Sequence, residues 1–195
     1  MTENNNPYRQ TKRTLIIGAP GTGKTTLLHR ILAQSGQKTL VITPYMNEWC
    51  ETDANGVELY PELADLRAAN LFFTGIQRHV FRPRYTLEHL NSFRRGIIVF
   101  DDCRGYFKAN LDEKIHSLLL GTRQNMIDVF AVAHGFREVP PVFFTFATDY
   151  ILFRTEDNLD RRASDIRCID VVRKMQAKVN KASVHNPYAY EWFKL

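Results

Sequence analysis

The stretch Gly18-Ala-Pro-Gly-Thr-Gly-Lys-Thr-Thr26 decides the fold of this chain. Residues 18–25 match the spacing G-x-x-x-x-G-K-[ST] at every fixed position. Glycines in such a loop allow tight turns that point backbone N–H groups inward, and the following helix offers its positive N-terminal end to the same place. The pattern therefore predicts a cradle for phosphate groups.

Two side chains in the stretch extend this prediction to a nucleotide with magnesium. Lys24 is a positive charge for the β- and γ-phosphate oxygens of ATP, and the hydroxyl of Thr25 is a ligand for Mg²⁺. We expect the nucleotide to be bound by Gly18, Ala19, Pro20, Gly21, Thr22, Gly23, Lys24, Thr25 and Thr26.

The sequence on either side of the loop has the patterns that such a site requires. Residues 14–19 form a short apolar run, which predicts a buried strand. Residues 24–34 carry apolar side chains on one helical face, and Gly36 follows as a C-terminal cap. A glycine-rich turn that matched by accident would lack this context.

The rest of the chain alternates apolar runs with helical patterns. Buried strands are expected at 39–44, 71–74, 96–102, 127–133 and 150–153, and helices at 111–122 and 159–175. This alternation predicts a three-layer α/β fold, in which helices cover both faces of a mainly parallel sheet. Ligands bind such sheets beyond the carboxyl ends of the strands. We therefore expect the chemistry where the strands at 14–19, 97–101 and 127–133 end.

Two acidic residues close the clearest of these strands, Ile97-Ile-Val-Phe-Asp-Asp102. Carboxylates at the ligand edge of a sheet suit Mg²⁺, as in the Walker B pattern. We assign Asp101 to the metal together with Thr25, and Asp102 to the orientation of the attacking water. The alternative is that the two acids simply begin a solvated loop.

A histidine and an arginine flank the strand expected at 127–133. His134 follows it directly, and it would face the γ-phosphate if that strand lay between the two motif strands. Arg123 ends the preceding helix, and from a neighbouring subunit it would stabilise the charge of phosphoryl transfer. The alternatives are that His134 only finds hydrogen-bond partners at the end of a strand, and that Arg123 caps the carbonyl groups at the end of its own helix.

Residues 77–95 combine positive charge with aromatic side chains. A basic loop of this kind predicts contact with a DNA backbone, and an ordinary solvated face is the alternative. The residues concerned are Arg78, Arg82, Arg84, Arg94 and Arg95, with Phe81, Tyr85 and Phe93 between them.

The composition is that of a single α/β domain. The chain has 195 residues and a net charge of +5, which suits a phosphate-rich partner. Cys50, Cys103 and Cys168 are far apart, so neither a disulfide framework nor a zinc site is expected. No secretory signal is visible, and the apolar stretch at 142–153 is too short to span a bilayer. We expect a soluble, cytoplasmic protein without stable membrane insertion.

The sequence divides into three parts. Residues 1–12 are a polar leader, residues 13–175 form the expected domain, and residues 176–195 follow it. The last part is either a terminal strand or a tail that docks on a capsid or a neighbouring subunit. Its aromatic composition comes from Tyr188, Tyr190, Trp192 and Phe193.

These motifs resemble the FtsK/HerA-type P-loop ATPases of the RecA/ASCE class. The resemblance is to genome-packaging ATPases of tailless icosahedral or membrane-containing viruses and to Zot-like phage proteins, and it covers roughly residues 13–157. It rests on residues 18–26, on 97–102, and on the block from 118–123 through 128–134 to 139–141. Asp102 stands where the family usually has Glu, and His134 where many members have Gln.

The resemblance implies a homo-oligomeric ring that hydrolyses ATP with Mg²⁺ between neighbouring subunits. The ring would move DNA into a preformed capsid, with capsid or portal-vertex proteins as partners. For a viral protein, this implies a place in the host cytoplasm or on the virion.

Other interpretations stay open. A nucleoside monophosphate kinase has a similar phosphate loop, and residues 161–167 imitate an arginine-bearing lid, but no acceptor site is visible. A GTPase is suggested by D-x-x-G at 102–105 and by Asn180-Lys181, although Ser183 stands where a base-reading Asp is needed. A nucleotide-binding assembly scaffold without turnover is the non-catalytic alternative.

Overall fold

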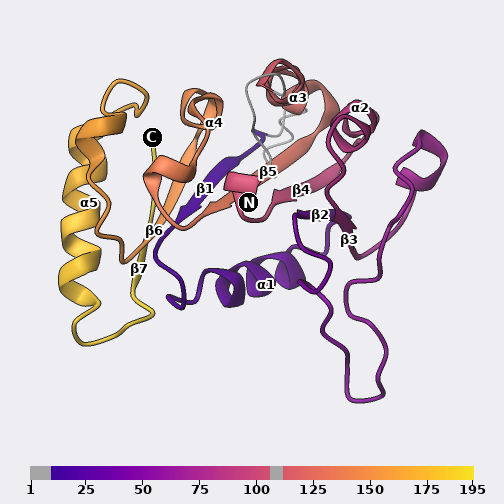
Figure 1. Cartoon of the computed structure of the whole chain (residues 1–195), viewed down its shortest axis with the longest axis horizontal. Helices are drawn as coiled ribbons and strands as arrows, with labels where there is room; N and C mark the ends of the chain where they lie inside the picture. The colour runs from indigo at the N-terminus through magenta and orange to yellow at the C-terminus, as the bar shows by residue number, and fades with distance from the viewer. Residues whose placement is uncertain (1–9, 106–111) are drawn as a thin grey trace, which may run out of the picture.

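In the part of the chain that the computed structural model describes, residues 10–105 and 112–195, seven strands form one sheet (Figure 1). Their order is β3-β2-β4-β5-β1-β6-β7, and all neighbours pair in parallel except the antiparallel β6 and β7. The strands are β1 (Arg13–Ile17), β2 (Thr39–Thr43), β3 (Ile76–Val80), β4 (Gly96–Phe100), β5 (Ile127–Ala133), β6 (Asp149–Phe153) and β7 (Tyr190–Lys194).

Helices cover both faces of this sheet (Figure 1). In that view α1 lies below the sheet, α2, α3 and α4 lie above it, and α5 covers the end formed by β6 and β7. The α-helices are α1 (Lys24–Ser35), α2 (Tyr85–Leu90), α3 (Asp112–Asn125), α4 (Pro141–Phe146) and α5 (Ile169–Ala182). Short 3-10 helices are η1 (Ala68–Leu71), η2 (Cys103–Gly105), η3 (Phe136–Glu138) and η4 (Leu159–Arg162). The three-layer α/β fold expected from the sequence is confirmed.

The strands are apolar throughout because each contributes to two cores. Successive side chains of a strand point to opposite faces. In β1, Leu15 and Ile17 therefore join the core under α3 and α4, while Ile16 joins the core under α1. Leu28 and Leu32 of α1 close the second core. A strand buried on both faces has no polar alternation, which is why the sequence shows continuous apolar runs.

The position of β5 builds the functional edge of the sheet. It pairs with β1 on one side, Ile17 opposite Ala133, and with β4 on the other, Phe100 opposite Ala131. Because the three strands are parallel and in this register, the residues that follow them emerge at one edge. The strand at 127–133 lies between the two motif strands, so the condition set for His134 is met.

The strand expected at 71–74 is wrong. Residues 68–71 form η1, and the strand begins after Gly75, whose φ of +73° breaks the extended backbone. The true strand, β3, contains Arg78 and His79, which are buried but paired. Arg78 Nη1 lies 3.5 Å from Glu62 Oε2. The ring nitrogens of His79 form hydrogen bonds, Nδ1 with Leu63 O at 2.7 Å and Nε2 with Thr86 Oγ1 at 3.0 Å. Because β3 contains these polar residues, a search for apolar runs selected residues 71–74 instead of the true strand.

The single helix expected at 159–175 is also wrong. Residues 159–162 form η4, and α5 begins only at Ile169, after Cys168 with a φ of 53°. The helix expected at 111–122 is α3, with Leu111 outside the described residues. The boundary expected at residue 175 falls inside α5, and the terminal strand is β7.

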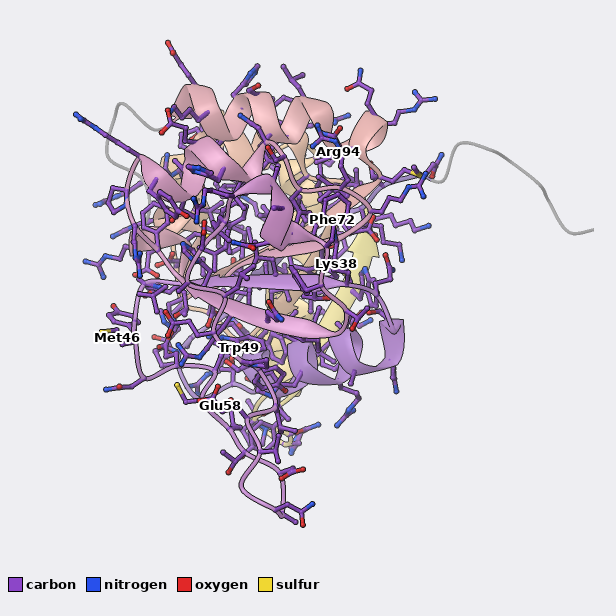
Figure 2. The ribbon with its side chains drawn as sticks, turned by 90° about the vertical axis from the view of Figure 1, so that its right-hand side faces the viewer. Lys38, Met46, Trp49, Glu58, Phe72 and Arg94 are labelled. Atoms are coloured by element: carbon purple, nitrogen blue, oxygen red, sulfur yellow. The ribbon has the colours of Figure 1, made fainter. Side chains whose placement is uncertain are left out.

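The segment between β2 and β3 projects beyond the sheet (Figure 1). Figure 2 shows this segment from the side and labels two of its residues, Trp49, which is buried in the core, and Glu58, which is exposed. Across residues 10–105 and 112–195, none of the helices has the length and apolar character needed to cross a membrane.

Candidate functional site

The loop between β1 and α1 needs its glycines for different reasons. Gly21 and Gly23 have φ values of +74° and +92°, in the left-handed region that favours glycine. At Gly18 the reason is space, because a Cβ there would lie 2.4 Å from the Cβ of Phe153. Within the loop, the hydroxyl of Thr22 donates to Ala19 O at 2.8 Å. The backbone shape of the phosphate-binding loop (residues 18–26) is therefore fixed by its own sequence and by β6.

Lys24 is folded back onto this loop. Its Nζ donates to Gly18 O at 2.7 Å and to Ala19 O at 2.9 Å. The side chain is buried, and burial lowers the pKa of the lysine, against the opposing attraction of Asp101 and other acids nearby. The ammonium group is thus held at the loop by carbonyl groups that a phosphate oxygen could replace.

Asp101 and Asp102 follow β4 at the same edge of the sheet. The indole N–H of Trp49 donates to Asp101 Oδ2 at 2.7 Å. Burial raises the pKa of Asp101, and this hydrogen bond opposes the shift. Asp102 has a φ of 51°, and its Oδ1 is buried with no hydrogen-bond partner among the described residues. A buried carboxylate oxygen without a donor is costly unless a ligand supplies one.

These residues line one cavity of about 430 Å³. The predicted residues on its wall are Pro20, Gly21, Gly23, Lys24, Thr25, Thr26, Asp101, Asp102 and His134. Mg²⁺ prefers hydroxyl, carboxylate and water oxygens. The hydroxyl of Thr25 and the carboxylate of Asp101 therefore fit a hydrated magnesium ion. Gly18, Ala19 and Thr22 do not line this cavity, although the hydrogen bond between Thr22 and Ala19 lies within the loop.

Glu48 is a site residue that the sequence analysis missed. It lines the same cavity, and with Thr25 and Asp101 it lines an adjoining cavity of about 450 Å³. The Thr43 hydroxyl donates to Glu48 Oε2 at 2.8 Å. Burial raises the pKa of Glu48, and the charges of the two aspartates add to the shift. The available signal was that β2 neighbours β4, but Glu48 stands five residues beyond the end of its strand.

His134 follows β5 and lies beside Lys24. Its Nδ1 is 3.2 Å from Lys24 Nζ, and its backbone N–H donates to Glu138 Oε2 at 3.1 Å. The histidine is exposed at the cavity wall. It can therefore respond to a ligand that displaces Lys24 from its present partners.

Arg123 is not brought to this cavity. It lies in the last turn of α3, before β5, and so at the amino edge of the sheet. The seven residues of β5 separate it from the carboxyl edge, about 20 Å at the rise of an extended strand. Within one subunit it cannot reach a ligand on the phosphate-binding loop.

The basic cluster at 77–95 is not the aromatic-dotted loop that was expected. Most of it forms β3 and α2. Arg78 is buried, Phe93 lies in the core, and Phe81 and Tyr85 pack against that core. The aromatic rings are therefore not displayed for stacking on a nucleic acid, and exposed arginines remain at 82, 84, 94 and 95.

No protein-family model and no curated protein matches this chain. Solved structures do. The genome-packaging NTPase B204 of Sulfolobus turreted icosahedral virus 2, in complex with AMP, superposes with a TM-score of 0.64 at 12% identity, over 94% of this chain and 92% of that one. B204 of Sulfolobus Turreted Icosahedral Virus, described as a DNA-packaging ATPase, superposes with a TM-score of 0.61 at 12% identity, over 95% of this chain and 94% of that one.

A looser superposition is with the N-terminal domain of the zonular occludens toxin from Neisseria meningitidis, with a TM-score of 0.49 at 14% identity, over 96% of this chain and 95% of that one. The B204 superpositions establish that the chain has the P-loop NTPase fold. The resemblance to viral packaging ATPases is thus confirmed at the level of the fold.

Proposed function

We propose that this chain is a P-loop ATPase whose hydrolysis of ATP drives the movement of DNA. The observation that carries the proposal is the shared cavity. Lys24 and Thr25 of the first motif and Asp101 and Asp102 of the second line it together, although they are far apart in sequence.

Each of these residues has a role in the proposed reaction. Lys24 exchanges its carbonyl partners for oxygens of the β- and γ-phosphates. Thr25 and Asp101 would hold Mg²⁺, which when bound would neutralise phosphate charge. Asp102 orients the attacking water, and the support for this is its buried Oδ1, which has no hydrogen-bond donor among residues 10–105 and 112–195. Glu48 is the other carboxylate on the wall that could act on this water.

His134 is proposed as the sensor of the γ-phosphate. It touches Lys24 Nζ, the group that moves when phosphate binds. A change at the γ-phosphate therefore reaches η3 through the His134–Glu138 hydrogen bond. This would couple hydrolysis to the segment between β5 and α4.

The proposal that the ATPase moves DNA rests on the fold and the charge. B204, with the same fold, is described as a DNA-packaging ATPase, and the net charge of +5 suits a polyanion. We further propose a homo-oligomeric ring, as the resemblance to packaging ATPases implies; in it Arg123, which cannot reach the nucleotide of its own subunit, would serve a neighbour's. Capsid or portal-vertex proteins would be its partners, in the cytoplasm of an infected cell or on the virion.

The test is phosphate release from ATP and Mg²⁺ by the full chain, with and without DNA, and with added AMP. Hydrolysis that DNA stimulates supports the proposal. Transfer of phosphate to AMP would show a kinase instead, and binding without turnover would show a scaffold.

Lys24→Ala is the matched variant for this assay. It removes the charge that stabilises the transferred phosphoryl group, so turnover should fall by about 10²- to 10³-fold. Phe72→Ala is the control, because Phe72 is 89% exposed and lies outside the cavity. Unchanged turnover in Lys24→Ala would contradict the assignment of the site.

A further inference from the structure

A further cavity of about 420 Å³ adjoins the phosphate-binding loop. Its walls are one face of α1, the end of β6, and the turn that leads into β7. Gly23, Thr26 and Tyr188 line both this cavity and the one that holds Lys24. A ligand whose phosphates lie on the loop can therefore extend into the second cavity without leaving the protein surface.

The second cavity is aromatic where the first is polar. Phe153 and Leu27 form an apolar floor, with 1% and 9% exposure. Tyr188 and Tyr190 stand above it with 63% and 42% of their surface exposed. The rings of Phe153 and Tyr190 are 5.3 Å apart between centroids. Nucleobases stack on such rings, because every base has a flat π-face.

Tyr188 is held in place by the turn that carries it. Its backbone N–H donates to Asn186 Oδ1 at 3.0 Å, and Ala189 N donates to Asn186 O at 2.9 Å. Its ring lies against the loop, since a Cβ at Gly23 would be 3.1 Å from Tyr188 Cδ1. The backbone of Tyr188 is thus held beside the phosphate site with the ring against Gly23, which reduces the ordering that binding a base would require.

Arg30 completes the wall of the second cavity. It lies one helical turn beyond Thr26 and Leu27, on the face of α1 that borders the cavity. A guanidinium group can pack on the face of an aromatic base. The cavity thus offers a flat aromatic surface and a planar cation to a flat ligand.

We propose that this second cavity binds the base of the nucleotide, with Tyr188 as the stacking residue. The proposal rests on the proposed function, because it takes the phosphates to lie at residues 18–26. It gives the turn between α5 and β7 a role in binding nucleotide rather than only in docking. The base would stack on aromatic rings, so its contribution to the binding free energy is separate from the contribution of the phosphates.

Tripolyphosphate separates the two contributions, because it has the phosphate chain of ATP and lacks the base. We would measure equilibrium binding of the β,γ-methylene analogue of ATP and of tripolyphosphate to the full chain, with Mg²⁺ present. Tyr188→Ala should bind the ATP analogue about 5- to 150-fold more weakly, the range for one lost stack. Its affinity for tripolyphosphate should equal that of wild type, and Tyr188→Phe should bind both ligands normally.

Phe72→Ala controls for the loss of an exposed aromatic ring elsewhere. If Tyr188→Ala weakens both ligands equally, Tyr188 only supports the loop at Gly23, and the base-binding proposal is wrong. If it weakens neither, the base lies elsewhere and the proposal is again wrong. If wild type binds neither ligand, the proposed function itself fails.

Discussion

The substitution Asp102→Asn is expected to stop turnover while leaving the fold and ATP binding intact. Asp102 has a φ of 51°, in a region that Asn adopts as readily as Asp. The substitution also removes one of two adjacent negative charges, because Asp101 precedes it. The free energy of unfolding should therefore stay within about 0.5 kcal/mol of wild type or rise.

The expected loss of activity is much larger than any loss of stability. Oδ1 of Asp102 is buried at the cavity without a donor among the described residues, and this is the oxygen that we assign to the water. A positioned group that accepts a proton in the transition state contributes about 10²- to 10⁴-fold to the rate. An amide cannot take up that proton, so kcat should fall by about this factor.

Three measurements check this prediction: urea unfolding, equilibrium binding of ATP, and phosphate release at saturating ATP. Glu48→Gln is the matched comparison, because it neutralises the other carboxylate whose role is open. A normal rate in Asp102→Asn would refute the assignment of the water to Asp102. If Glu48→Gln were then the slow variant, Glu48 would hold that role.

Two further substitutions test the supports of the site. Trp49→Phe removes the indole donor to Asp101. Because burial already raises the pKa of Asp101 and this hydrogen bond opposes the shift, the pKa of Asp101 should rise further in the variant. As the pH is lowered, the Mg²⁺-dependent hydrolysis of the variant should therefore be lost at a higher pH than that of wild type. Gly18→Ala places a Cβ 2.4 Å from the Cβ of Phe153, so urea unfolding should show a loss of about 1–3 kcal/mol. Gly121→Ala in α3, where the nearest atom is the flexible Asn125 amide, should show no loss. A pH profile of Trp49→Phe that loses activity at the same acidic pH as wild type would contradict the first prediction. Equal free energies of unfolding for the two alanine variants would contradict the second.

The parts of the site that were predictable lie in short contiguous motifs. Residues 18–26 and 97–102 each carry their own spacing, and the strand context around them is local. His134 could be placed because it directly follows a strand, and parallel strands end at one edge of a sheet. In these cases the sequence neighbours of a residue determine its position.

The parts that were missed depend on contacts between distant segments. From the segment after β2, Glu48 reaches the cavity and Trp49 reaches the adjoining one, and Tyr188 reaches the cavity from the turn before β7. The polar strand β3 was missed because Arg78 and His79 find partners only in the folded chain. The helical pattern at 159–175 predicted one helix, but Cys168 has a positive φ that interrupts it. The spacing of apolar residues does not reveal such a φ.

The most direct test of the account is a crystal structure of the full chain with the β,γ-methylene analogue of ATP and Mg²⁺. We predict the three phosphates on the amides of residues 18–26, with the metal between Thr25 and Asp101 and Lys24 Nζ released from the carbonyl of Gly18. A nucleotide bound away from this loop, or bound there with Asp101 and Asp102 remote from its phosphates, would contradict it.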